Sequence, residues 1–291
     1  MPWKQDDFVR SLVSASPNTV AAYRHDVVEF TAWVERTGIA EPAGVTPLTL
    51  RRYLAYLSTR RYARRTIARK AAALRRYFDW LRRRGVIATD PARRLSAPKG
   101  ESRLPRILKG QELAILLGDL PPAGAESRAQ VDSKGPDGVD LRDRAVVELL
   151  YGSGLRVAEL CSLRTGDVDV RTGRLLVWGK GAKQRQMPMS QPSVEAVQAW
   201  LRGGRAELAT PESPPDVLFL NRRGRPLTPR DVRRILDRRA PVPTHPHALR
   251  HTFATHHVRK GTKLDVVRQA LGHESLATTS VYVGLAREVM D

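Results

Sequence analysis

Residues 51–84 combine a dense run of basic side chains with apolar side chains at helical spacing. The apolar positions include Ile67, Leu74 and Phe78, and the only acidic residue in the stretch is Asp79. This spacing predicts amphipathic helices, and the arginines between the apolar positions predict basic outer faces. Such a stretch must fold as packed helices rather than remain a disordered tail. A folded basic face can lie along a nucleic-acid duplex and neutralise several phosphates.

The composition of the whole chain agrees with a polyanionic partner. The formal net charge is +20, and nucleic acid is the usual partner of so basic a protein. A high-GC genome that favours arginine explains part of the excess but not its clustering. The single cysteine, Cys161, rules out an internal disulfide framework and fits a reducing compartment. Without an apolar signal region or a membrane-spanning run, we expect a cytoplasmic protein with no membrane contact.

The first part of the chain is predicted to form a helical DNA-binding domain over residues 1–90. Ser16-Pro17-Asn18 is a helix-start signal, Thr46-Pro47 precedes a second helix, and Thr66 precedes a third. About four helices are expected before Gly85. Residues 91–106, rich in proline and in polar and basic side chains, are predicted to be a linker.

The second predicted domain spans residues 107–291 and is mostly helical. Residues 121–140 are rich in proline, glycine and polar side chains, which predicts a mobile surface loop inserted into the domain. Three short strands are expected at 168–170, 174–178 and 185–189, with turn signals between them. Helices are expected to resume at Ser193, Thr228, Pro246, Lys263 and Ser275. The predicted fold class is therefore mainly α with a small antiparallel β-sheet, in two domains.

Polar residues capable of phosphoryl transfer are spread along this second domain. The candidate catalytic set is Arg156, Lys180, His247, Arg250, His273 and Tyr282. Attack on a phosphodiester requires positive donors for the non-bridging oxygens, a proton for the leaving oxygen, and an oriented nucleophile. Arginine forks suit phosphate oxygens, a lysine in the Gly179-Lys180-Gly181 turn can donate a proton, and a tyrosine can attack. Nearby cations are expected to favour the phenolate form of that tyrosine.

Each member of the set also has an ordinary structural interpretation. Arg156 and Lys180 can be surface residues, His247 a histidine at a helix start, and Tyr282 a half-buried core residue. Several histidines near His247 raise the possibility of zinc, but no cysteine pairs with them and no His-Glu-x-x-His motif occurs. The Gly-x-x-x-x-Gly-Lys-Ser/Thr pattern of nucleotide-binding loops is also absent. The set therefore predicts phosphoryl transfer with neither a metal nor a cofactor.

The same motifs resemble those of the tyrosine recombinases, the phage integrase family, and within it the Xer subfamily on its XerC-like side. The resemblance covers nearly the whole chain. It rests on the segments 16–26, 141–160, 179–185, 246–255, 271–273 and 278–282. All six catalytic positions of the family are filled by the expected residue types, which is a highly specific combination.

The resemblance implies a two-domain clamp on DNA, made of a helical core-binding domain and a mixed α/β catalytic domain. It implies that Tyr282 attacks DNA to form a 3′-phosphotyrosine, that Arg156 and Arg250 hold the phosphate, and that Lys180 is the general acid. His247 and His273 then assist. It also implies a tetramer on two DNA sites and strand exchange through a Holliday junction, without ATP. In the family a C-terminal helix packs onto the next protomer, and residues 285–291 allow only a short one.

The function expected from the resemblance is site-specific recombination that resolves chromosome dimers at cell division. An integrase of a phage or mobile element is the alternative, although the helical pattern from Ser16 leaves no room for an additional N-terminal arm-binding domain. A catalytically inactive DNA-binding homologue and a type IB topoisomerase are further alternatives. The sequence leaves open whether the tetramer includes a second Xer recombinase and whether an FtsK-type translocase controls it.

Overall fold

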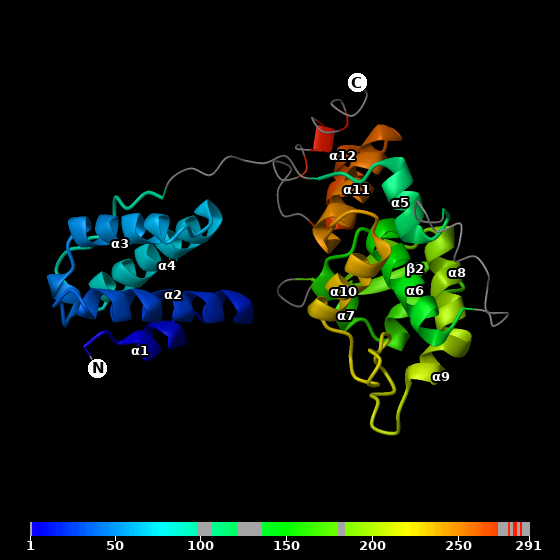
Figure 1. Ribbon diagram of the computed structural model, residues 1–291, viewed down its shortest axis with the longest axis horizontal. Coiled ribbons are helices and arrows are strands. Elements are labelled where there is room, and N and C mark those ends of the chain that lie inside the picture. Colours follow the sequence, from blue (N-terminus) through cyan, green and yellow to red (C-terminus); the bar gives the residue numbers. More distant parts are fainter. Residues whose placement is uncertain are drawn as a thin grey trace. The chain divides into compact units, whose positions relative to one another are not determined.

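The computed structural model describes residues 2–97, 106–120, 136–179, 184–272, 279, 282–283 and 286. The chain divides into two compact units, Met1–Arg103 and Leu104–Asp291. The described residues are mainly helical with one small antiparallel sheet, which confirms the predicted fold class (Figure 1).

The first unit is a helical bundle. Its helices are α1 (Gln5–Arg10), α2 (Pro17–Glu35), α3 (Pro47–Thr59) and α4 (Arg64–Arg83), with a 3₁₀ turn at Pro42–Gly44. α2 begins where the Ser16 side chain accepts a hydrogen bond from the backbone N–H of Thr19, and Thr46 caps α3 in the same manner. The short helix α1 was not predicted. It lies against α2, while α2, α3 and α4 pack against one another (Figure 1).

Aromatic side chains fill the core of this unit. Phe30, Tyr53, Tyr77 and Phe78 are completely buried, and their rings meet mostly edge to face. The apolar residues predicted to be the inner face of the basic stretch lie in this core, as does Leu81. The amphipathic helices expected from the sequence are therefore present.

One member of the basic stretch is not on the outer face. Lys70 is only 2% exposed, and its ammonium donates to Asp26 at 3.1 Å and to Glu29 at 2.8 Å. Arg69 also donates to Asp26. A buried ammonium requires such partners, because an unpaired charge in the core is strongly unfavourable.

The expected linker starts later than residue 91. Ala92 and Leu95 are buried in the core of the first unit, and Arg75 donates to the Leu95 carbonyl at 2.7 Å. Residues 91–95 therefore belong to the bundle. Burial of these two apolar side chains holds the segment against the core, although its proline- and arginine-rich composition predicted a linker. Residues 98–105 lie outside the described residues.

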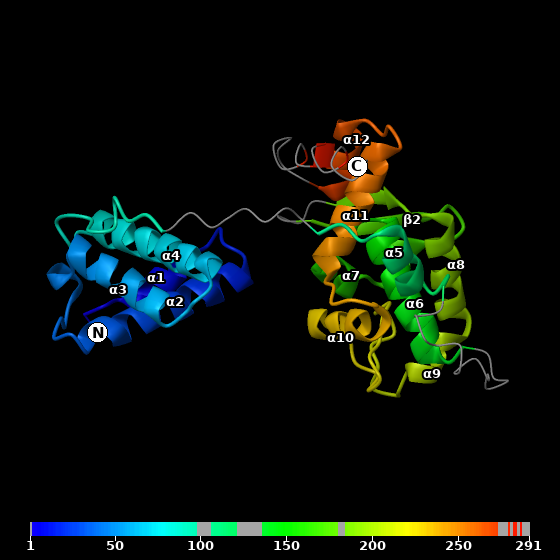
Figure 2. The same cartoon turned by 45° about the horizontal axis from the view of Figure 1, so that its top comes forward.

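The second unit surrounds a central helix. Its helices are α5 (Gly110–Leu117), α6 (Gly138–Gly152), α7 (Val157–Ser162), α8 (Gln191–Ala199), α9 (Arg205–Leu208), α10 (Pro229–Arg239), α11 (Pro246–Arg259) and α12 (Leu264–Leu271). A 3₁₀ turn at Thr165–Asp167 follows α7, and a π-helical turn at Trp200–Gly204 joins α8 to α9. α6 packs against α5, α8 and α11, so most of its side chains are buried (Figures 1 and 2).

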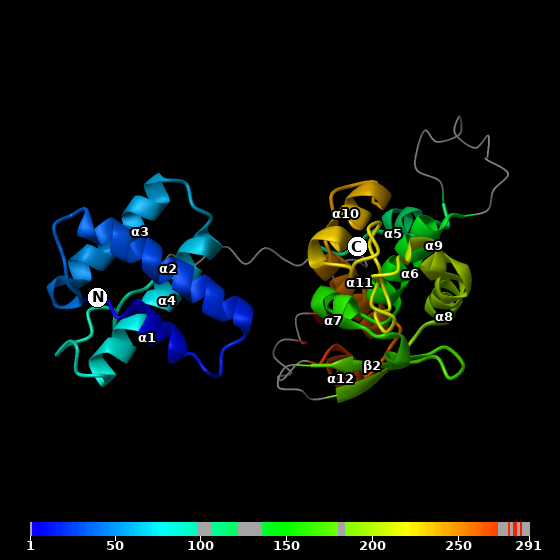
Figure 3. The same ribbon diagram turned by 90° about the horizontal axis from the view of Figure 1, so that it is seen from below.

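The sheet has the order β1-β2-β3 and is antiparallel throughout. The strands are β1 (Val168–Asp169), β2 (Arg174–Trp178) and β3 (Gln184–Pro188), each within a residue or two of its predicted position. Leu175 pairs with Met187, and both side chains face the core. β3 runs close to α12 at one edge of the unit (Figure 3).

The predicted loop at 121–140 ends in helix. Asp137 caps α6 by accepting from the backbone N–H of Asp140 at 2.8 Å, so residues 138–140 form the first turn. The N–H of Gly138 donates to Glu207 at 2.6 Å, which ties this turn to α9. The cap signal in Asp137 outweighed the glycine- and proline-rich composition that predicted a loop. Residues 121–135, the greater part of the predicted insertion, lie outside the described residues.

Candidate active site

Four of the six predicted catalytic residues are described: Arg156, His247, Arg250 and Tyr282. Lys180, in the connection between β2 and β3, and His273, after α12, lie outside the described residues. The described part of the site consists of the two arginines, the tyrosine, the exposed histidine and the residues that contact them.

Gly154 creates the break from which Arg156 projects. α6 ends at Gly152, and Gly154 has a φ of +61°, a conformation that glycine adopts without strain. A Cβ at this position would lie 2.5 Å from the ring of Phe253 in α11, so only glycine allows the segment between α6 and α7 to approach α11 this closely. The chain then reverses into α7, with Arg156 as its N-cap residue.

Arg156 is held through its guanidinium and through its backbone N–H. Its guanidinium donates to Glu159 at 2.8 Å and to the carbonyl of Gly272 at 3.1 Å. Its backbone N–H donates to the other oxygen of Glu159, also at 2.8 Å. Because the side chain is still 40% exposed, the guanidinium can meet an anion from solution.

Arg250 is almost completely buried, at 1% exposure, beside Arg156. Its guanidinium donates to the carbonyl of Gly154 at 2.8 Å and to the carbonyl of Leu271. Burial and the neighbouring charge of Arg156 lower the pKa of Arg250 to about 10, so the guanidinium remains charged at neutral pH. The two arginines therefore share an anchor, the end of α12 at Leu271 and Gly272, and concentrate positive charge there.

Tyr282 lies next to this pair of arginines. It is 3% exposed and packs against Phe253, Val267 and Leu271, while its hydroxyl lies 2.9 Å from Nδ1 of His251. Burial raises the pKa of Tyr282 above its usual range, and the charges of Arg250 and Arg156 lower it by less than that. The expectation that nearby cations would favour phenolate was therefore wrong in its net direction, because desolvation is the larger effect.

His247 occupies the first turn of α11 and is exposed. Arg250, three positions later in α11, is buried in the core, whereas His247 stays at the surface. The ring of His247 instead meets that of His251 edge to face, with 4.6 Å between centroids. His251 thus connects the predicted histidine to the predicted nucleophile.

Glu159 was missed at the sequence level, although its signal was present. Arg156 and Glu159 have the spacing of a capping box, in which the third residue of a helix reaches back to the N-cap. Glu159 also accepts two hydrogen bonds at 3.0 Å from Arg185 of β3. Burial alone would raise the pKa of Glu159, but the hydrogen bonds from Arg185 and Arg156 outweigh it and hold the pKa below its usual range.

Arg185 and His251 were missed as well. Arg185 is one arginine among many in the sequence, and only the fold places its guanidinium beside Gly272. A Cβ added to Gly272 would lie 3.1 Å from the central carbon of that guanidinium. His251 was noted in the sequence only as one of several nearby histidines, and its spacing of four from His247 was the available signal.

Other parts of the described structure do not offer competing chemistry. No group of three or more His, Cys, Asp or Glu among the described residues is arranged to hold a metal ion. Burial raises the pKa of Cys161 to about 12, which makes it a poor nucleophile, and the side chain packs against the core of the second unit. No helix within the described ranges is long and apolar enough to cross a membrane.

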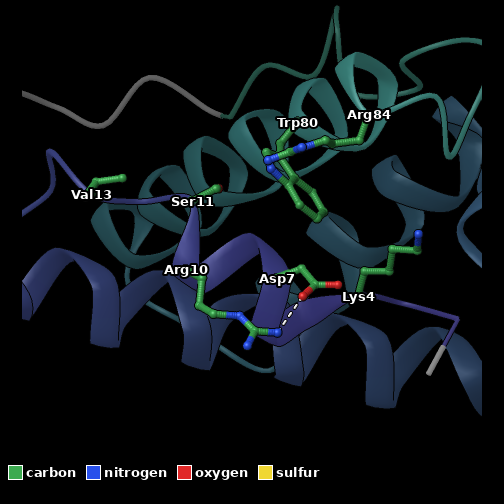
Figure 4. A pocket seen from close by; sticks show the side chains of 7 residues that line it. All are labelled: Lys4, Asp7, Arg10, Ser11, Val13, Trp80 and Arg84. Carbon is green, nitrogen blue, oxygen red and sulfur yellow. Dashed lines mark hydrogen bonds and ion pairs between the residues drawn. The ribbon is translucent and has the colours of Figure 1, made fainter.

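A pocket of about 610 Å³ lies in the first unit (Figure 4). It is lined by Lys4, Asp7, Arg10, Ser11, Val13, Trp80 and Arg84. Its single acid, Asp7, is paired with Arg10 at 2.6 Å. None of the four described catalytic residues lines this pocket, so we do not place the reaction there.

Comparisons with known proteins show the family to which the chain belongs. Residues 129–288 match the model of the phage integrase family, and residues 6–85 match the phage integrase N-terminal SAM-like domain. Tyrosine recombinase XerC from Halalkalibacterium halodurans is 37% identical over 94% of this chain and 88% of its own length. Tyrosine recombinase XerC from Mycobacterium sp. (strain JLS) is 41% identical over 92% and 88%.

Solved structures show the same fold at lower sequence identity. XerH site-specific recombinase bound to a palindromic difH substrate matches with a TM-score of 0.72 and 22% identity, over 100% of this chain and 83% of that one. The Tn1549 transposon integrase in complex with transposon right end DNA matches with a TM-score of 0.73 and 20% identity, over 97% and 94%. With its family models, its relatives and a tyrosine beside two arginines, the chain belongs to the phage integrase family and is a site-specific tyrosine recombinase, of the enzyme class that cleaves and rejoins DNA.

Proposed function

We propose that Tyr282 is the nucleophile of this recombinase and that Arg156 and Arg250 bind the phosphate it attacks. The observation that carries the proposal is the convergence of the three side chains at the end of α12. Arg250 and Arg156 are anchored to the adjacent carbonyls of Leu271 and Gly272, and both charges act on the hydroxyl of Tyr282. Charged donors fixed before the reaction are what a developing phosphorane requires.

The reaction proceeds without a net change in the number of phosphoester bonds. The Tyr282 oxygen forms a bond to phosphorus, the bond from phosphorus to the 5′-oxygen breaks, and the 5′-oxygen leaves with a proton. From the sequence resemblance we assign that proton to Lys180 and assisting roles to His247 and His273. The 3′-phosphotyrosine keeps the energy of the phosphodiester, so a 5′-hydroxyl of another strand can reverse the step without a cofactor.

The substrate we propose is double-stranded DNA carrying a recombination site. Support comes from the net charge of +20 and from the exposed arginines that face outward on α4 and α10. On α4 these are Arg64, Arg65, Arg75, Arg76, Arg82 and Arg83, and on α10 they are Arg230, Arg233, Arg234 and Arg238. DNA complexes of XerH and of the Tn1549 integrase, which share the fold, support the same substrate class.

The biological role we propose is resolution of chromosome dimers at cell division, in the cytoplasm. The relatives named tyrosine recombinase XerC, at up to 41% identity, support this role over that of a mobile-element integrase. We further propose a tetramer on two DNA sites, with a second Xer recombinase as the other pair of subunits and an FtsK-type translocase as its regulator. A deletion strain that divides without accumulating dimeric chromosomes would contradict the role.

The chemical part of the proposal is tested by trapping the covalent intermediate. The protein is incubated with a nicked duplex carrying a Xer-type site, and a denaturant-resistant protein–DNA band is expected. Tyr282→Phe must abolish the band. Tyr151→Phe is a matched control, because the hydroxyl of Tyr151 is also hydrogen-bonded to a histidine of α11, at 2.9 Å from His256. A band that survives Tyr282→Phe would show that another residue attacks.

A further inference from the structure

His251 contacts the reacting atom of the site directly. Its Nδ1 lies 2.9 Å from the hydroxyl oxygen of Tyr282, and the two rings are 5.5 Å apart between centroids. His251 follows Arg250 in α11, so the helix that supplies a phosphate-binding arginine also supplies this contact. None of the roles inferred from the sequence resemblance includes His251.

The tyrosine needs a proton acceptor within reach. Its burial favours the neutral phenol, and a neutral phenol is a weak nucleophile. Arg156 and Arg250 are cations and cannot accept a proton, and Glu159 is occupied by hydrogen bonds from Arg156 and Arg185. An imidazole nitrogen that does not carry a proton is a suitable acceptor near neutral pH.

We propose that His251 is the general base that deprotonates Tyr282. The inference rests on the proposed role of Tyr282 as the nucleophile. As the tyrosine oxygen bonds to phosphorus, its proton moves to Nδ1 of His251, and the 5′-oxygen leaves with a proton from a separate acid. In the reverse step, a 5′-hydroxyl attacks the phosphotyrosine and gives its proton to the group that acted as the acid, while His251 returns its proton to the departing phenolate. Protons and phosphoester bonds balance in both directions.

The groups facing His251 fit this role. On its own helix, His247 meets its ring edge to face, so the imidazolium that forms lies next to a second imidazole. From the segment after α12, Tyr282 faces Nδ1, and the charges of Arg250 and Arg156 act on the same phenol. These two arginines stabilise the phenolate that is left when the proton moves to His251.

A second tyrosine–histidine pair on the same helix provides an internal comparison. His256 Nδ1 lies 2.9 Å from the hydroxyl of Tyr151, the same distance as in the proposed catalytic pair. Burial and the charge of Glu148 both raise the pKa of Tyr151, and none of the described arginines opposes them there. A hydrogen bond of this kind is therefore not by itself a sign of catalysis, and the His256 pair is the control for a purely structural contact.

The decisive variant is His251→Asn. An asparagine oxygen can replace Nδ1 as a hydrogen-bond acceptor but cannot hold the proton. We expect single-turnover formation of the covalent adduct at neutral pH to slow by about 10²–10⁴-fold, the usual contribution of a general base. The deficit should narrow as the pH rises, because hydroxide then ionises the phenol without help. His256→Asn should leave the rate unchanged.

A sulfur-substituted substrate separates a base from an acid. In a duplex with a 5′-bridging phosphorothiolate, the leaving thiolate needs no proton, so loss of a general acid is repaired while loss of a general base is not. His251→Asn should therefore remain slow on this substrate. Rescue would assign the acid role to His251 and overturn the proposal. So would a His251→Asn rate within about threefold of wild type on the ordinary substrate, since the contact would then be only structural.

Folding and the proposed function are monitored separately. DNA binding and the melting temperature of His251→Asn should match those of wild type. If they do not, His251→Gln provides the second test, and a rate near wild type in either folded variant overturns the proposal. A wild-type protein that forms no adduct, or a Tyr282→Phe protein that still does, would instead overturn the proposed function, so the two failures are distinguishable.

Discussion

Gly154→Ala should destabilise the second unit, because the added methyl group meets both a strained backbone and a filled core. The new Cβ would stand 2.5 Å, 2.9 Å and 3.1 Å from three ring atoms of Phe253, at a φ of +61°. A non-glycine residue in this conformation costs about 1–2 kcal/mol. Overpacking of a filled core adds about 1–3 kcal/mol, and Phe253 is only 8% exposed, so its ring has little room to move. The expected total is therefore about 2–5 kcal/mol.

Gly261→Ala separates the two contributions. Gly261, between α11 and α12, has a φ of +78° but no atom within 4 Å of the place that a methyl group would take, so only the backbone cost of about 1–2 kcal/mol applies. Combining Gly154→Ala with Phe253→Leu should recover the packing part and leave the backbone part. Gly154→Ala should also slow DNA cleavage, because the carbonyl of Gly154 anchors Arg250 at 2.8 Å.

Hydrogen exchange in urea is the appropriate assay, because tryptophans in both units would mix their fluorescence signals. Peptides from α6 and α11 report on the second unit, and peptides from α4 serve as the internal reference. A loss for Gly154→Ala no larger than that for Gly261→Ala would refute the close approach of Gly154 to Phe253. Absence of coupling with Phe253→Leu would do the same.

Four further outcomes are expected. Lys70→Met, which leaves Asp26 with one partner fewer in the core, should destabilise the first unit by about 3–5 kcal/mol in urea exchange of α4 peptides, and an unchanged value would mean that the ammonium is not buried. Glu148 has a pKa raised to about 7 by burial, so its stabilising contribution is complete in acid and is lost as the pH rises through that value. Glu148→Gln should therefore stabilise the second unit by about 3 kcal/mol above neutral pH and by little in acid, and a gain that did not depend on pH would contradict the assignment. Glu159 has a lowered pKa, so it stabilises the fold above its unfolded pKa of about 4.3, and this stabilisation is lost as the pH falls through the folded value. Glu159→Gln should therefore reduce the loss of folding stability in acid, and it should also slow cleavage. Both effects are measurable on one protein sample. Arg233→Ala on the exposed face of α10 should weaken DNA binding and reduce the slope of log affinity against log salt by about one, and a slope equal to that of wild type would remove α10 from the interface.

Local signals predicted much of the fold. The Ser16-Pro17 start of α2, the Thr46-Pro47 start of α3 and the turn signals on either side of β2 depend on neighbours along the chain, and all three elements are present. The burial of Lys70 could not be predicted in this way, because its partner Asp26 lies 44 residues away. The helix α1, six residues long, is too short to give a periodic pattern.

In the site, too, the contacts between residues close in the sequence were recognisable, and the contacts made only by the fold were not. The pairing of Arg156 with Glu159 is local and had a recognisable spacing, whereas Arg185 and the carbonyl of Gly272 reach the same place only through the fold. The contact between His251 and Tyr282 joins residues 31 positions apart. The net direction of the pKa of Tyr282 depends on how deeply the ring is buried, which spacing along the chain does not reveal.

The anchoring of both arginines to the end of α12 has a mechanical consequence. Leu271 and Gly272 hold the guanidinium groups, and nine residues of chain join Gly272 to Tyr282. Tyr282 packs in the same cluster as Leu271, so a displacement of the end of α12 would disturb the two phosphate donors and the attacking group together. We therefore expect each subunit to gain or lose phosphate binding and nucleophilic attack together. Few subunits should bind a phosphate that they cannot attack.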